Sequence, residues 1–106
     1  MKYAVVNASS SGDNTIIAAV ANKRIRVIHY TLGCDQNADV YFKSDGTTNL
    51  TGKIYFAASS SFSAGYGAIT PIGLVGLFET NTGEPLVMNI NGAKTVSGHI
   101  TYVVVD

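Results

Sequence analysis

The sequence contains no tryptophan, one cysteine and two prolines in 106 residues. Because Cys34 has no partner in the chain, no internal disulfide can form, and the usual support of small secreted domains is excluded. The pair of cysteines packed on a tryptophan that marks an antibody domain is absent too. We interpret Cys34 as a small buried apolar residue.

Charge is also scarce, at 13% of residues, and the seven basic residues balance the seven acidic ones. Nucleic acids and anionic membranes attract an excess of lysine and arginine, so composition argues against both as partners. Exposed charge also keeps proteins apart in solution. A neutral chain with so little charge is therefore expected to have part of its surface covered by another protein.

The longest stretch without charge runs from residue 54 to residue 78, a length that suggests a membrane helix. Serines, glycines and Pro71 interrupt it, and its apolar residues alternate as they do in strands. The apolar run near the N-terminus is too short for a signal peptide. We expect neither a membrane span nor a secretory signal.

The rest of the sequence reads as short alternating segments cut by turns. Residues 38–44, for example, place Val40 and Phe42 on one face and Tyr41 and Lys43 on the other. Eight or nine such segments are expected, covering 2–8, 15–21, 24–33, 38–44, 50–58, 59–67, 76–80, 85–91 and 99–105.

Strands of this number and spacing predict an all-β fold, an antiparallel β-sandwich that is either an eight-stranded jelly roll or an immunoglobulin-like sandwich. We expect one domain over residues 1–106, with residues 1–14 as an N-terminal arm or an edge strand. Asn22-Lys23 suits a hairpin between two of the strands, and Asp45-Gly46 is a strong turn signal. The valines that end the last strand leave it no polar face, which predicts a central strand covered on both sides.

No set of residues has the spacing of an active site or a metal site. The carboxylates mostly fall in or beside predicted turns, and His29 and His99 occupy strand positions, where half-buried, hydrogen-bonded histidines are common. Cys34 lacks the context of a nucleophile. We therefore expect no enzymatic activity, no cofactor and no metal. Binding of a sugar is left as an alternative, because the chain has eight asparagines and several tyrosines that could stack on sugars, namely Tyr30, Tyr41, Tyr55, Tyr66 and Tyr102.

Three segments together resemble a family of small capsid decoration, or cement, proteins of tailed bacteriophages, and the resemblance covers roughly residues 15–106. The first carries the pattern F-K-S…T-x-L-T-G, the second L-x-x-T-x-x-G-x-x-L, and the third V-x-G-x-x-x-Y. The matching residues are Phe42, Lys43, Ser44, Thr48, Leu50, Thr51 and Gly52; Leu77, Thr80, Gly83 and Leu86; and Val96, Gly98 and Tyr102.

The resemblance implies a β-sandwich or jelly roll that binds the major capsid protein lattice and stabilises the mature head. It implies assembly on the outer surface of the virion after synthesis in the host cytoplasm, and a homo-oligomer, with a trimer favoured. A phage fibre or receptor-binding module that contacts a host glycan is the alternative, because related domains occur in such proteins.

Residues 64–78, AGYGAITPIGLVGLF, combine loop-forming glycines with apolar side chains. In the related proteins the corresponding region is shorter, so this stretch is where the chain could meet its own neighbours. Around a symmetry axis, an apolar loop from each copy becomes a shared core. The alternative is that the loop folds back and plugs one end of the sandwich. The predicted interface residues are Tyr66, Ile69, Ile72 and Leu74 in this stretch and Tyr3 and Val5 in the first strand.

Overall fold

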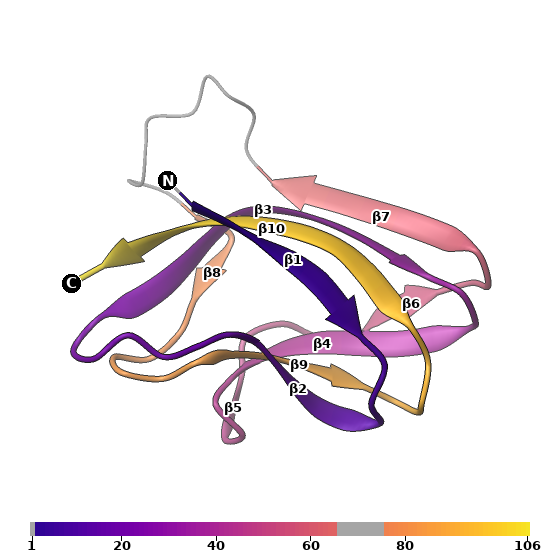
Figure 1. Cartoon of the computed structure of the whole chain (residues 1–106), viewed down its shortest axis with the longest axis horizontal. Helices are drawn as coiled ribbons and strands as arrows, with labels where there is room; N and C mark the ends of the chain where they lie inside the picture. Colours follow the sequence, from indigo (N-terminus) through magenta and orange to yellow (C-terminus); the bar gives the residue numbers. More distant parts are fainter. Residues whose placement is uncertain (1, 66–75) are drawn as a thin grey trace.

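The computed structural model describes residues 2–65 and 76–106, and within these ranges the chain is built from strands and turns without a helix (Figure 1). The described residues thus contain no helix that is long and apolar enough to cross a membrane. The strands are β1 (Lys2–Ala8), β2 (Gly12–Ile17), β3 (Arg24–Cys34), β4 (Ala38–Ser44), β5 (Thr48–Asn49), β6 (Ile54–Phe56), β7 (Ser60–Gly65), β8 (Phe78–Glu79), β9 (Leu86–Ile90) and β10 (Val96–Val105).

The strands form two antiparallel sheets that pack face to face, which confirms the predicted β-sandwich (Figure 1). Sheet A has the order β1-β10-β3-β7, with β8 also paired to β3. Sheet B has the order β2-β9-β4-β5, with β6 also paired to β4. The first and last strands therefore pair with each other, and six of the nine connections between these strands lead from one sheet to the other.

The strand order also bears on the choice between a jelly roll and an immunoglobulin-like sandwich. If β5 with β6 and β7 with β8 are each counted as one interrupted strand, eight strands remain, in the orders 1-8-3-6 and 2-7-4-5. A jelly roll is two such four-stranded sheets with Greek-key connections. We interpret this strand order as that of a jelly roll.

The core lies between the sheets and is made of alternating residues from both. On β4, Ala38, Val40 and Phe42 are buried, as the alternation predicted, and Cys34 is buried as expected. On β9, Leu86, Met88 and Ile90 are buried as well. The largest fully buried side chains are those of Phe42, Ile25, Leu32, Leu86, Met88, Ile90, Ile100, Val6, Val27, Val40, Val96 and Thr80.

The prediction that Asn22-Lys23 forms the turn of a β-hairpin is wrong. Asn22 does adopt a left-handed turn conformation with φ 63°, but β2 lies in sheet B and β3 lies in sheet A, so the turn connects two layers. A turn signal fixes a reversal of the chain without fixing which strands pair. The predicted strand 15–21 is also displaced, because β2 begins at Gly12, inside the expected loop, and ends at Ile17.

The last strand is central, between β1 and β3, but the prediction that both its faces are covered is wrong. Val96 and Ile100 are buried, whereas Ser97 and His99 are exposed on the other face. The strand also begins at Val96 rather than near His99. Sheet A therefore presents one face to the core and one to solvent, as antiparallel sheets commonly do.

Candidate functional site

The structure describes two of the six predicted interface residues, Tyr3 and Val5. Tyr66, Ile69, Ile72 and Leu74 lie outside the described residues. Tyr3 and Val5 lie on β1, where their side chains are 76% and 73% exposed. They point away from the core, because Val6 and Ala8 on the same strand are buried.

Strand pairing extends these outward positions across sheet A. Tyr3 on β1 faces Thr101 on β10, and Val5 faces His99, so the exposed face continues onto the central strands. We call the set of outward positions the outer patch. It comprises the rows Tyr3–Thr101–His29, Val5–His99–Thr31–Ser63 and Asn7–Ser97–Gly33–Ser61.

The outer patch contains no lysine, arginine or carboxylate. Small hydroxyl side chains occupy much of it, and two of them are paired, since Thr31 Oγ1 and Ser63 Oγ lie 2.9 Å apart. Its larger side chains are one tyrosine, one valine and two histidines. Burying such a surface against a partner costs little desolvation free energy, because neutral hydroxyls lose less hydration free energy on burial than charged groups do.

The two histidines form a pair at the centre of the outer patch. The rings of His29 and His99 are stacked, with centroids 6.3 Å apart and planes inclined by 23°. They lie diagonally on adjacent strands, because His29 pairs with Thr101 and His99 pairs with Thr31. His29 is half-buried as predicted, whereas His99 is exposed, which the sequence interpretation missed.

The outer face of sheet B is chemically different. Lys43 Nζ on β4 lies 3.2 Å from both carboxylate oxygens of Asp13 on β2, and Asn89 Nδ2 donates to Asp13 Oδ1 at 2.8 Å. The hydrogen bond from Asn89 lowers the pKa of Asp13, with burial opposing the shift and Lys43 reinforcing it. The charges of Asp13 and Lys43 are therefore already paired within the chain.

Charge also returns on sheet A beyond the outer patch. Arg24 Nη1 lies 3.3 Å and Arg26 Nη2 3.2 Å from the carboxylate of Glu79 on β8. Lys23 and Asp106 pair nearby, where the chain ends. The outer patch is thus bounded at this end of the sheet by ion pairs.

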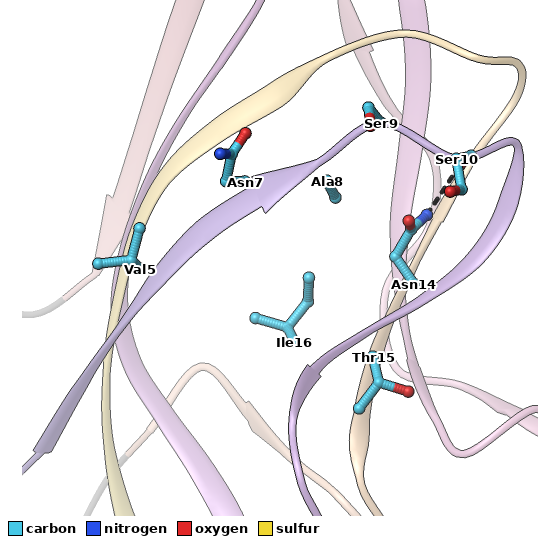
Figure 2. Close-up of a pocket in the computed structure, with 8 residues that line it drawn as sticks. All are labelled: Val5, Asn7, Ala8, Ser9, Ser10, Asn14, Thr15 and Ile16. Atoms are coloured by element: carbon cyan, nitrogen blue, oxygen red, sulfur yellow. Dashed lines mark hydrogen bonds between the residues drawn. The ribbon is translucent and has the colours of Figure 1, made fainter.

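A shallow groove of about 250 Å³ opens between β1 and β2, the edge strands of the two sheets (Figure 2). Asn14 Nδ2 in this groove donates to the carbonyls of Ser10 and Gly12, at 2.9 and 3.0 Å, so its amide stabilises the β1–β2 turn. The lining residues are Val5, Asn7, Ala8, Ser9, Ser10, Asn14, Thr15 and Ile16. The groove offers amides and hydroxyls but neither an aromatic face nor a carboxylate.

The described residues hold no group of three or more histidine, cysteine or acidic side chains placed to share a metal ion. Tyr30 has a raised pKa because it is buried, and its ring packs edge-on against Phe42 at 5.3 Å. Such an environment explains the shift by core packing, without a catalytic role.

Sequence reasoning named Tyr3 and Val5 as interface residues, which stays a prediction, and it did not name the other residues of the outer patch. The patch depends on the register of four strands that are not consecutive in the chain. The available signal was the alternation of small polar residues with apolar ones in Thr31-Leu32-Gly33 and Ser61-Phe62-Ser63.

No family model, curated protein or solved structure matches this chain.

Proposed function

We propose that this chain is a non-enzymatic capsid decoration protein of a tailed bacteriophage, and that its outer patch docks on the lattice of the major capsid protein. The proposal rests on the resemblance of three sequence segments to that family and on the chemistry of the outer patch. The order of the strands supports the jelly roll that the resemblance implies.

The observation that carries the proposal is the difference between the two outer faces of the sandwich. Sheet B places Asp13 and Lys43 on its surface and pairs them with each other. The outer patch of sheet A carries no charged side chain, and Tyr3 and Val5 are largely exposed on it. Charged residues are depleted at the centres of protein interfaces, so the uncharged outer patch of sheet A is the surface better suited to a protein partner.

The outer patch alone is small for a stable contact. Four strands about 4.8 Å apart and five residues along each give a footprint of about 300 Å². A standard interface buries about 800 Å² on each partner. We therefore propose that single copies bind weakly and that occupancy of the shell depends on several contacts made at once, which multiply the effective affinity.

The additional contacts come, in this proposal, from neighbouring copies of the chain arranged as a trimer. Tyr66, Ile69, Ile72 and Leu74 keep their predicted role in that contact, on the basis of the sequence alone. Light scattering on the purified protein tests this part of the proposal. A trimer supports it, and a monomer that persists at high concentration contradicts it.

The docking proposal is tested by co-sedimentation of the purified protein with phage heads that have been stripped of their decoration proteins. The heads should come from a phage whose genome encodes this chain. Saturable binding in a fixed ratio to the major capsid protein is expected. Protein that stays in the supernatant at every concentration, with heads before and after expansion, would contradict the proposal.

The alternative function is a fibre or receptor-binding module that recognises a host glycan. The groove between β1 and β2 supplies the amides of Asn7 and Asn14 but no aromatic ring on which a sugar could stack. The structure gives this alternative less support than docking. Glycan-array binding that is lost on substitution of Asn7, together with no binding to heads, would favour it.

A further inference from the structure

We infer that His29 and His99 form a bidentate binding site for a divalent transition-metal ion on the solvent face of sheet A. The inference rests on the geometry of the two side chains and does not depend on the proposed capsid role. It can be tested on the isolated protein, so a negative result for metal binding would not contradict the capsid proposal, and a negative result for capsid binding would not contradict the metal site.

The two rings lie close enough to share one ion after a rotation of their side chains. They project from adjacent strands at diagonal positions, stacked with centroids 6.3 Å apart. Two imidazoles that share one tetrahedral ion through metal–nitrogen bonds of about 2.0–2.1 Å have ring centroids about 5 Å apart. The rings must therefore approach by about 1 Å and turn a nitrogen toward the ion, which requires rotation of the half-buried His29 and the exposed His99 side chains.

The backbone that carries the two histidines is well fixed. β3 and β10 pair antiparallel over most of their lengths, and β1 and β7 flank them on either side. The inward neighbours of the histidines, Tyr30 and Ile100, are buried in the core and pair directly with each other. Because the two Cα positions are held in place, binding requires only that side-chain rotamers be selected.

The donor set indicates which ions are bound. Neutral imidazoles suit zinc, copper and nickel, whereas magnesium and calcium prefer oxygen ligands. No carboxylate lies in the outer patch to supply such oxygens. Two protein ligands leave the other coordination positions to water, so the site should bind reversibly and more weakly than a four-ligand structural zinc site.

The chain is well suited to a clean test, because these are its only two histidines and its single cysteine is buried. Isothermal titration of the tag-free protein with Ni²⁺ or Zn²⁺ should give one ion per chain. Mg²⁺ and Ca²⁺ should give no binding at the same concentrations. A saturating metal should also raise the midpoint of thermal unfolding, because it binds the folded arrangement of the two strands.

Single substitutions distinguish a chelate from two separate ligands. In a chelate, His29→Gln and His99→Gln should each weaken Ni²⁺ binding by about tenfold or more, since the second imidazole acts at a high effective concentration. Both side chains are on the solvent face, so circular dichroism should show that both variants remain folded. Two ions per chain, or variants that each keep half the sites at the parent affinity, would overturn the inference. So would the absence of any binding.

Discussion

Thr80 and Ile25 are joined by two reciprocal hydrogen bonds. The backbone N–H of Ile25 donates to Thr80 Oγ1 at 3.0 Å, and the backbone N–H of Thr80 donates to the carbonyl of Ile25, also at 3.0 Å. Both residues are completely buried. The threonine of the L-x-x-T-x-x-G-x-x-L segment therefore has a structural role, because it fixes the chain after β8 against the start of β3.

Substitution of Thr80 by valine should destabilise the protein by about 1–3 kcal/mol, because the N–H of Ile25 would be buried without an acceptor. Valine has nearly the same shape, so little packing is lost. Thr82 is a suitable control, since its hydroxyl accepts an exposed hydrogen bond from Arg24. Urea unfolding of both variants checks the prediction; equal losses for Thr80→Val and Thr82→Val would contradict it.

A second prediction concerns Gly98 in β10. Its φ is 148°, and a Cβ placed there would lie 1.9 Å from the carbonyl oxygen of Thr31. Gly98→Ala should therefore cost about 3 kcal/mol or more, combining backbone strain with a clash that the sheet cannot relieve easily. Gly52→Ala is the matched control, because a Cβ at Gly52 meets nothing within 4 Å. A melting temperature that is equally affected in both variants would refute this explanation.

These two residues illustrate how much of the fold follows from the sequence. The alternation at Val40 and Phe42 gave the correct inward face because only two neighbouring positions need be compared. Thr80 and Gly98 could be recognised in the sequence as parts of a motif. The sequence did not show why the fold requires a threonine and a glycine at these positions. Each depends on a contact with β3, which is more than fifty residues away in the chain.

The errors have a related physical cause. A turn at Asn22 reverses the chain equally well within a sheet or between sheets, and only the packing of the two layers decides between them. The outer patch was missed for the same reason, since His29 and His99 become neighbours only when β3 and β10 pair. Tyr3 and Val5 were accessible to sequence reasoning because a single strand contains both.

Acid should weaken the fold partly through Asp13. The hydrogen bond from Asn89 lowers the pKa of this carboxyl below its usual value of 3.8 in the folded protein. The stabilisation is therefore present above that value and is lost as the pH falls through the lower folded pKa. Asp13→Asn should unfold with a shallower pH dependence below about pH 4.

The carboxyl chemical shift of Asp13 provides a direct check of this origin. Asn89→Ala should move the titration midpoint of Asp13 upward, because the strongest lowering interaction is removed. If the midpoint does not move in this variant, the hydrogen bond is not the cause of the shift.

Alkaline conditions should weaken the fold through Tyr30. Burial raises the pKa of its hydroxyl above 10.0 in the folded protein, whereas the unfolded chain ionises near that value. Stability is therefore intact below about pH 10 and declines as the pH rises toward the folded pKa. Chemical unfolding at pH 9 and pH 11 should show a smaller difference for Tyr30→Phe than for the parent. An unchanged difference would exclude Tyr30 as a source of alkaline sensitivity.

The central claim, that sheet A is the docking face, is tested most directly by comparing two tyrosines. Tyr3 on sheet A and Tyr55 on sheet B are 76% and 74% exposed, so truncation of either should leave the fold equally intact. Co-sedimentation with stripped heads measures the affinity of Tyr3→Ser and Tyr55→Ser in parallel. The account predicts that Tyr3→Ser loses about tenfold in affinity or more, as expected for an aromatic interface residue, while Tyr55→Ser binds like the parent. Loss of binding on Tyr55→Ser with Tyr3→Ser unaffected would contradict it and would assign docking to sheet B.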